Sequence, residues 1–336
     1  MNYIGRFAPS PTGPLHLGSL VSALASWLDA KAHGGDWLIR IEDIDATRCK
    51  PQWSDFILRQ LDACGLHSDG PIVFQSRRSS LYLQYLERLM PTGRLYLCHC
   101  SRLQIQQSQA QSQSRNPLRA NSPSTLNPSV YPGTCRTRAP IQASDYTHSL
   151  SATDGSLSPL LQTHGGANFF RFSQDQSVRI TVGDQVIEWC DRLMGSQQQN
   201  ISQEVGDFVL KTKDNHFSYQ WAVVVDDIEQ GVSDVVRGAD LADNTPRQLF
   251  LYDLLQQAWP RYLHVPLVLN EDGDKLSKQT QALALNPDLA STDLNQAAEH
   301  LGLSSSDAPI SDRLQSWVQA WSQRHTRSHT SATKMA

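Results

Sequence analysis

The alternation of short apolar runs with helical periodicity over residues 3–98 constrains the fold more than any other feature of this sequence. The expected elements, in chain order, are strands at 3–7, 37–43 and 71–76 separated by helices at 20–28 and 56–64, followed by a helix at 81–89 and a strand at 94–98. Gly65 is a typical residue for closing the second helix. This order predicts an α/β domain with a mainly parallel sheet.

Composition excludes several classes of protein. With 336 residues, 39% of them hydrophobic, the chain can bury a sizeable core. The formal net charge of -4 gives no bulk attraction for nucleic acid, so RNA binding would need a local basic patch. No apolar run approaches the ~20 residues that span a bilayer, and residues 1–7 do not resemble a signal peptide. We therefore expect a cytoplasmic location and no membrane partner.

The second half of the chain is less regular. Residues 104–128 are polar and low in complexity, as is a stretch around 148–166, and both are expected to be disordered or loosely ordered insertions. Further on we expect a strand at 178–182, strand and helix signals over 208–227, a helix from Thr245 to about Trp259 and a last strand at 264–270. The final 45 or so residues predict one or two weak helices and a frayed tail from residue 324.

The Pro-rich turn after the first strand, PSPTGPLHLGS (9–19), is the first candidate site. It precedes a helix, whose N-terminus offers free N–H groups and partial positive charge to a phosphate. Gly18 allows close approach of a nucleotide, and His16 adds an imidazole; a simple turn with a capping histidine is the alternative. Lys275 and Lys278 follow the last strand on a loop that could reach polyphosphate, or could be a solvated basic turn. Neither G-x-G-x-x-G nor a Walker A sequence is present.

Together, RFAPSPTGPLHLGS (6–19) and KLSK (275–278) resemble the two ATP-binding motifs of class I aminoacyl-tRNA synthetases. Ser19 stands at the last position of the first motif, where the glutamate subgroup tolerates small residues. RIEDID (40–45), VVVDD (223–227) and VRGADL (236–241) extend the resemblance to glutamyl-tRNA synthetases over most of residues 3–280.

The resemblance implies a Rossmann-like class I catalytic domain with a parallel sheet, an inserted zinc-bearing subdomain and a short helical C-terminal region. The implied boundaries are 1–97 for the first half of the catalytic domain, 98–140 for the zinc-binding segment with its polar insertion, 141–210 for an inserted acceptor-binding-like subdomain, 211–285 for the second catalytic half with the KLSK loop, and 286–336 for the C-terminal helical region and tail.

An L-glutamate site needs cations for two carboxylates and an anion for one ammonium. Arg6 and Arg237 can donate to carboxylates, and Glu42 can receive the ammonium; the alternatives are a salt bridge of Arg237 with Asp240 and a surface position for Glu42. The resemblance implies glutamate binding by Arg6, Phe7, Ala8, Pro9, Ser10, Glu42, Tyr219 and Arg237. It implies ATP binding, with Mg²⁺ carried by ATP, by His16, Gly18, Ser19, Lys275 and Lys278, with His16 and Lys278 stabilising the transition state.

Fewer than 60 residues follow KLSK, whereas glutamyl-tRNA synthetases carry a long helical anticodon-binding region there. This pattern resembles the bacterial glutamyl-Q tRNA(Asp) synthetase family. In that family ATP activates glutamate without tRNA, and the glutamyl group goes to a hydroxyl of queuosine in the anticodon of tRNA(Asp). The alternatives are a shortened glutamyl-tRNA synthetase charging the 3′ end of tRNA(Glu), an inactive RNA-binding module and another adenylate-forming ligase. No stable protein partner is implied.

Cysteine spacing predicts a metal site. Cys98, Cys100 and Cys135 provide two close thiolates and one distant thiolate, which suit one tetrahedral structural Zn²⁺. The family resemblance implies Tyr131 as the fourth ligand, and His99 is the rival on chemistry alone. Free buried cysteines are the alternative to a metal site. The other cysteines, Cys49, Cys64 and Cys190, are expected to be core or surface residues.

Overall fold

The structure is a computed structural model of the chain. It describes residues 2–101, 103–108, 130–131, 133–136, 146–149, 169–172, 176–270, 276 and 283–325. Within the polar segment 104–128, residues 104–108 are helical, so the expectation of disorder is wrong for these residues; the rest of the segment lies outside the described residues.

Two sets of parallel strands form the centre of the molecule. Strands β1 (Ile4–Phe7), β2 (Asp36–Ile41) and β3 (Val73–Phe74) pair in that order, and β11 (Asp234–Gly238) pairs with β12 (Arg261–Val265). Strand β11 lies beside β1, because the Ser233 N–H donates to the Ile4 carbonyl oxygen at 2.9 Å and the Ile4 N–H donates to Ser233 Oγ at 2.9 Å. The parallel α/β core expected from the sequence is confirmed.

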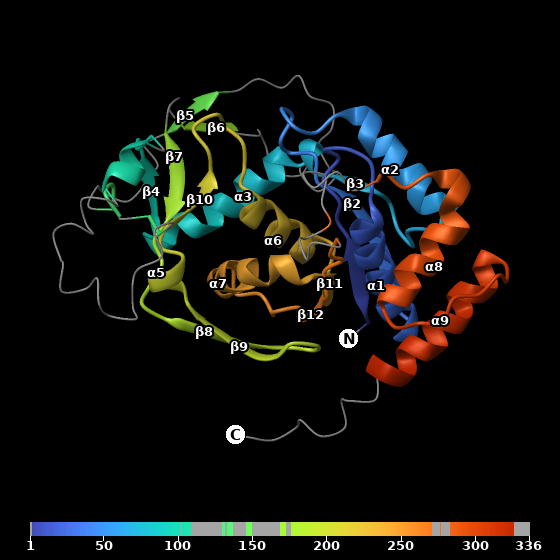
Figure 1. The fold of residues 1–336 in the computed structure, drawn as a ribbon. Coiled ribbons are helices and arrows are strands. Elements are labelled where there is room, and N and C mark those ends of the chain that lie inside the picture. The colour runs from blue at the N-terminus through green and yellow to red at the C-terminus, as the bar shows by residue number, and fades with distance from the viewer. Residues whose placement is uncertain are drawn as a thin grey trace.

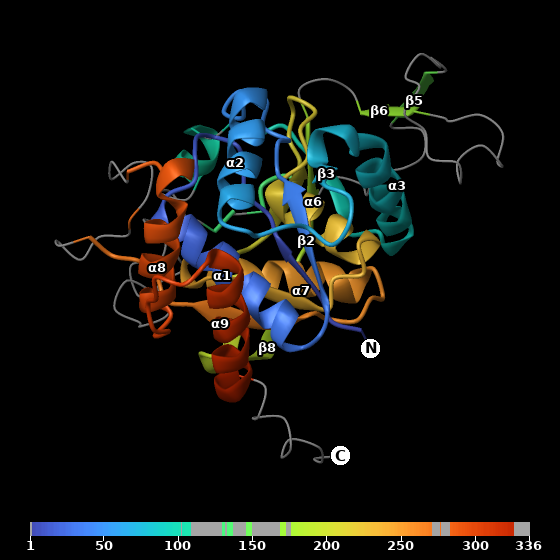
Figure 2. The ribbon, with the colours of Figure 1, turned by 90° about the vertical axis from the view of Figure 1, so that its right-hand side faces the viewer.

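Helices cover this core on both sides. They are α1 (Leu17–Ala32), α2 (Pro51–Ala63), α3 (Ser79–Leu89), α6 (Tyr219–Glu229), α7 (Thr245–Leu254), α8 (Ala290–His300) and α9 (Ile310–His325). One hydrophobic cluster joins α1, α2, α8 and α9 to β1 and β2, and a second joins α3, α6 and α7 to a smaller sheet. Figures 1 and 2 show α8 and α9 on the outer side of α1. Helix α2 ends just before Gly65, whose φ of +70° is the left-handed conformation that closes a helix.

The smaller sheet is antiparallel and contains β4 (Leu95–Cys98), β7 (Ser177–Ile180) and β10 (Phe208–Lys211), in the order β10–β7–β4. Strand β4 is present where the sequence predicts it, but it does not continue the parallel sheet as the alternation of strands and helices suggests. Its partner β7 is distant in the chain, and no local pattern encodes such a pairing. Strands β5 (Tyr146–Ser149) and β6 (Phe169–Phe172) form a separate antiparallel pair.

Two element ends differ from the sequence prediction. Helix α7 stops at Leu254 and not near Trp259, and Gln256 then adopts a φ of +55°, which a helix cannot contain. The last strand ends at Val265, so most of residues 264–270 lie beyond it. Pro266 follows directly and has no N–H to donate to a neighbouring strand, which explains the end of the pairing.

A hairpin of β8 (Val186–Asp191) and β9 (Gly195–Asn200) extends the parallel sheet at its β12 edge. Asp191 pairs with Tyr262 of β12, and the Arg192 N–H donates to the Tyr262 carbonyl oxygen at 2.8 Å. The short helix α5 (Ile201–Glu204) follows, with the Asn200 side chain as its N-cap. This hairpin is not among the elements predicted from the sequence.

The sequence predicts weak C-terminal helices, but the structure shows both of them firmly packed. Trp317 and Trp321 of α9 are 3% and 2% exposed, and α9 continues through His325 into the expected tail. Asp29 of α1 lies under this helix and accepts hydrogen bonds from Tyr3 Oη at 2.5 Å, Arg192 Nη1 at 2.5 Å and Trp321 Nε1 at 2.9 Å. One fully buried carboxylate therefore joins the residue that precedes β1, helix α1, the β8–β9 turn and α9. Among the described residues, no helix combines the length and apolar character that a membrane span requires.

We predict that Asp29→Ala lowers the free energy of unfolding by about 3–5 kcal/mol, because it leaves the nearly buried Arg192 guanidinium without its main counterion. Chemical denaturation monitored by circular dichroism measures the change. Asp62→Ala is the control: Asp62 pairs with His67 on the surface, and such exposed pairs contribute little. Equal effects of the two substitutions would contradict the role given to Asp29.

Candidate functional site

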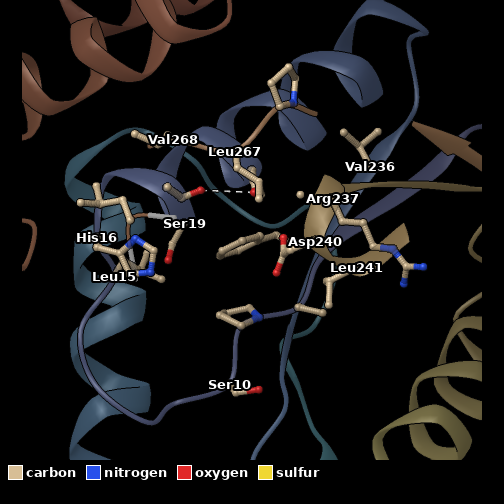
Figure 3. A pocket seen from close by; sticks show the side chains of 18 of the residues that line it. Ser10, Leu15, His16, Ser19, Val236, Arg237, Asp240, Leu241, Leu267 and Val268 are labelled. Carbon is tan, nitrogen blue, oxygen red and sulfur yellow. Dashed lines mark hydrogen bonds between the residues drawn. The ribbon is translucent and has the colours of Figure 1, made fainter. Parts of the chain in front are cut away.

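A cavity of about 370 Å³ opens at the carboxyl ends of β1 and β11. Its wall is made by β1 and the turn after it, the first turn of α1, the end of β11 and the loop after β12 (Figure 3). From this junction β1 pairs outward with β2, and β11 pairs outward with β12 on the other side. Ligands of open α/β sheets bind in the crevice where the strand order diverges in this way.

The N-terminus of α1 forms one side of the cavity. His16 is the N-cap residue, in extended conformation, and its carbonyl oxygen accepts from the N–H groups of Ser19 and Leu20 at 2.9 and 3.0 Å. The His16 side chain makes no capping hydrogen bond, so the alternative of a capping histidine is not supported. Figure 3 shows His16 and Ser19 together on this side, at the positive end of the helix.

The first of the two motif segments lies against the chain that follows the second. Gln60 of α2 is 1% exposed; its Oε1 accepts from the Leu15 N–H at 2.9 Å and its Nε2 donates to the Leu285 carbonyl oxygen at 2.8 Å. Leu276, between Lys275 and Lys278, lines the cavity. A Cβ on Gly18 would lie 3.2 Å from the His16 ring and 3.5 Å from the Leu276 carbonyl oxygen, so a glycine allows this close approach.

Arg237, at the end of β11, lies on the opposite side of the cavity from His16 (Figure 3). Its guanidinium donates from Nε to His264 Nε2 at 3.0 Å, from Nη1 to Gln248 Oε1 at 2.8 Å and from Nη2 to Thr245 Oγ1 at 2.8 Å. The expected alternative, a salt bridge with Asp240, is not among the ion pairs of the described residues. Arg237 therefore enters the cavity wall as a buried cation held by neutral side chains.

Arg6 of β1 is held differently. Its Nε and Nη2 donate to the two carboxylate oxygens of Asp227, on α6, at 3.1 and 3.3 Å. Arg40 of β2 contacts the same carboxylate at 2.8 Å through Nη1. Arg6 is 3% exposed and Arg40 is fully buried, so Asp227 balances charge that water cannot reach. The pairs fix the Arg6 side chain in the wall of the cavity.

Glu42 lies next to this cluster and not on the surface, which excludes the alternative of a surface charge. It is 8% exposed, and its Oε1 lies 3.5 Å from Arg40 Nη2. Its backbone N–H donates to the Pro9 carbonyl oxygen at 3.0 Å, which ties the end of β2 to the turn after β1. Burial raises the pKa of Glu42 to about 7, against the opposing effect of the Arg40 and Arg6 charges.

The structure brings most of the expected site residues together. Those that line the cavity are Arg6, Phe7, Ala8, Pro9, Ser10, His16, Gly18, Ser19, Tyr219 and Arg237. Glu42 is not in the wall but lies directly behind it. Lys275 and Lys278 lie outside the described residues, so the structure says nothing of their side chains.

Sequence reasoning missed the residues behind Arg237. Thr245, Gln248 and His264 are all at most 2% exposed, and each bonds the guanidinium. The sequence contains one signal for this group: a histidine inside the apolar strand RYLHV must find polar partners when the strand is buried. Gln248 carries a similar signal in the apolar helix α7.

Cys98, Cys100 and Cys135 form a second candidate site, with sulfur atoms all within 4.8 Å of one another. Tyr131 Oη lies 3.4 Å from Cys98 Sγ and 3.7 Å from Cys100 Sγ, whereas the His99 residue is exposed. Burial acts to raise the pKa of Cys135, but hydrogen bonds from the His99 backbone N–H and Tyr131 outweigh it and lower the pKa. Three sulfurs and one phenol oxygen around one point fit a four-coordinate metal ion.

The family model for class I tRNA synthetases (E and Q), catalytic domain, matches residues 4–137 and 157–298. A curated glutamyl-Q tRNA(Asp) synthetase of Albidiferax ferrireducens is 47% identical over 95% of this chain and 98% of its own length. The chain belongs to the glutamyl-Q tRNA(Asp) synthetase family. A second curated glutamyl-Q tRNA(Asp) synthetase, from Chromobacterium violaceum, is 43% identical over 95% of this chain and 94% of its own length. This confirms the family resemblance drawn from the motifs.

The fold of this chain is similar to that of a solved glutamate tRNA ligase. A glutamate tRNA ligase of Elizabethkingia meningosepticum, in complex with its amino acid, superposes with a TM-score of 0.63 at 28% identity. The match covers 83% of this chain and 52% of that ligase, so this chain spans about half the ligase's length. The class I synthetase catalytic fold expected from the sequence is thereby confirmed. Class I tRNA synthetases are ligases that use ATP, and this chain belongs to that class.

The raised pKa of Glu42 gives a pH prediction for stability. In the unfolded chain Glu42 ionises near pH 4.5, and in the folded chain near pH 7, so the folded state binds more protons between these values and stability falls as pH rises through the window. Glu42→Gln removes this loss. We expect the variant's stability relative to the wild type to improve by up to about 3 kcal/mol between pH 4.5 and pH 8. Denaturant titrations at the two pH values measure it; a constant difference would contradict the raised pKa.

Proposed function

We propose that this protein activates L-glutamate with ATP in the absence of tRNA and transfers the glutamyl group to the queuosine base in the anticodon of tRNA(Asp). The observation that carries the proposal is the cavity at the β1–β11 junction, which has cationic side chains at one end and a helix N-terminus at the other. Family membership supports the acceptor, since the curated relatives matched over nearly their whole length bear the name glutamyl-Q tRNA(Asp) synthetase.

The proposed amino-acid end uses Arg6, Arg237, Tyr219 and Glu42. Arg237 suits a carboxylate of glutamate, because it has no carboxylate partner among the described residues and can donate from a fork. Tyr219 lines the cavity and is 36% exposed, so part of its side chain can contact a bound substrate. Glu42, when ionised, would balance the charge of the ammonium from behind the wall, where its backbone N–H bonds the Pro9 carbonyl oxygen. Phe7, Ala8 and Pro9 would shape the wall of the same pocket.

The proposed nucleotide end uses the first turn of α1. ATP would lie with its phosphates at His16, Gly18 and Ser19, where the helix N-terminus stabilises negative charge. An α-carboxylate oxygen of glutamate attacks the α-phosphorus; the bond from that phosphorus to the β-phosphate oxygen breaks, and pyrophosphate leaves with Mg²⁺. His16 and, from the KLSK loop, Lys275 and Lys278 would stabilise charge on the phosphates in the transition state. No protein nucleophile is required.

In the second step a hydroxyl of queuosine attacks the carbonyl carbon of glutamyl-adenylate. The new ester bond forms, the bond from carbon to the phosphate oxygen breaks, AMP leaves, and the hydroxyl proton passes to the released phosphate or to solvent. The same cavity serves both steps, so the anticodon arm has to present the base at its mouth.

The cysteine cluster is proposed to hold one structural Zn²⁺ with Cys98, Cys100, Cys135 and Tyr131 as ligands. Its chemistry fits that ion, because three thiolates and one phenolate give four ligands without an open position for a substrate. Arg136 beside Cys135 pairs with the buried Asp207 at 2.7 Å, which joins this segment to the antiparallel sheet. The metal would then hold the two parts of the segment together and take no part in the reaction.

The activity test is glutamate-dependent exchange of labelled pyrophosphate into ATP without RNA, followed by glutamate transfer to tRNA(Asp) prepared with and without queuosine. We expect exchange with glutamate but not with glutamine or aspartate, and transfer only to the tRNA that carries queuosine. Exchange that requires tRNA, or transfer to tRNA(Glu), would point to a translational synthetase and contradict the proposal.

The zinc proposal predicts different results for its two rival ligands. Tyr131→Phe removes the oxygen that lies among the sulfurs, so the protein should lose zinc to a competing chelator at least ten times faster than the wild type. His99→Ala should behave as the wild type, because that residue is exposed. Metal content by mass spectrometry after chelator challenge measures both. Faster loss from the His99 variant alone would assign the fourth position to histidine.

A further inference from the structure

We infer that the buried pair Asp191–His264 positions Arg237 for a carboxylate of the substrate by fixing which nitrogen of the imidazole carries the proton. The inference deepens the proposed function and rests on it in one respect, namely that Arg237 contacts glutamate. His264 is 1% exposed and Asp191 is 2% exposed, and neither lines the cavity. They act through Arg237 and are positioning residues.

The contacts of His264 determine its tautomer. Its Nε2 lies 3.0 Å from Arg237 Nε, which carries a hydrogen and can only donate, so Nε2 must accept. The proton then resides on Nδ1, which lies 2.6 Å from Asp191 Oδ2 and donates to it. Burial and the Arg237 charge lower the pKa of His264 despite the neighbouring carboxylate, in agreement with a neutral ring.

Asp191 is itself fixed by the β8–β9 turn. Its Oδ1 accepts from the backbone N–H groups of Leu193 and Met194, both at 2.9 Å, and from that of His264 at 3.3 Å. Oδ2 is thereby directed at the imidazole. The next residue, Arg192, bonds Asp29 of α1, so the turn that holds Asp191 is anchored at the opposite side as well.

The remaining partners of Arg237 are also neutral. Thr245 Oγ1 and Gln248 Oε1 each accept from one terminal nitrogen, and Gln248 Nε2 donates onward to Gln220 Oε1 at 3.1 Å. Each terminal nitrogen of an arginine has two hydrogens, so the described part of the chain leaves one donor on Nη1 and one on Nη2 for a ligand. These neutral partners orient the Arg237 guanidinium without neutralising its charge, so a substrate carboxylate can do so. Arg6, in contrast, already forms an ion pair with Asp227.

Asp191→Asn tests the inference because it reverses the proton arrangement in a nearly isosteric side chain. Three backbone N–H groups hold the Oδ1 position, so the amide oxygen must remain there and the amide nitrogen must replace Oδ2. That nitrogen donates to His264 Nδ1 and drives the proton to Nε2, where it faces the Arg237 Nε–H. We expect the KM for glutamate to rise at least tenfold, with the KM for ATP changed less than twofold.

The direction of this change separates positioning from simple electrostatics. Loss of a buried anion near Arg237 would by itself make the site more positive and strengthen binding of a carboxylate substrate. An unchanged or lower KM for glutamate would therefore overturn the inference. Asp184→Asn is the matched control, since Asp184 is an exposed carboxylate just before the same hairpin and accepts hydrogen bonds from Asn200 and Ser202; it should leave both KM values unchanged.

The tautomer of His264 can be measured by NMR spectroscopy, independently of any activity assay. In ¹⁵N-histidine-labelled wild-type protein, two-bond proton–nitrogen spectra should show His264 protonated on Nδ1 only, with the signal assigned by its loss in His264→Gln; a ring protonated on Nε2 or on both nitrogens would overturn the inference even if Asp191→Asn failed to fold. A wild type without glutamate-dependent exchange would instead refute the proposed function, and this spectrum would still test the contact.

Discussion

Two buried arginines on neighbouring strands, Arg6 and Arg40, share the carboxylate of Asp227, which comes from α6 in the second half of the chain. Arg6 is 3% exposed and Arg40 is fully buried, so loss of the carboxylate would leave two adjacent like charges with little access to water. The pairs also hold β1 and β2 against α6, and Arg6 itself lines the cavity. The site thus depends on a contact between segments separated by about 200 positions in the chain.

The cavity separates two kinds of positive charge. At one end the partial charge of the α1 N-terminus is suited to phosphate, and at the other Arg237 presents a full charge held by Thr245, Gln248 and His264. A substrate with a carboxylate can occupy the second while its reacting end meets the nucleotide at the first. This arrangement favours a carboxylate substrate over a neutral analogue. A buried arginine without an anion is unfavourable in free energy, and only the carboxylate supplies that anion.

The sequence was sufficient for the parallel core and for most of the cavity wall, because both depend on local signals: the strand–helix alternation, the Pro-rich turn before α1 and the motif residues from Arg6 to Ser19. It could not supply the pairing of β4 with β7, the β8–β9 hairpin or the end of α7, which depend on distant partners or on a single backbone angle. The positioning pair was missed for the same reason. Asp191 and His264 are 73 residues apart and meet only after β8 docks on β12.

The central claim is that the chemistry ends on a base in the anticodon and not on the terminal ribose. The most direct measurement is the position of the label in tRNA(Asp) after reaction with radiolabelled glutamate and ATP, found by digesting the RNA to nucleosides and separating them. The account predicts that all label elutes with queuosine and none with the 3′-terminal adenosine. Label on the terminal adenosine would contradict it and assign this cavity to the charging of tRNA.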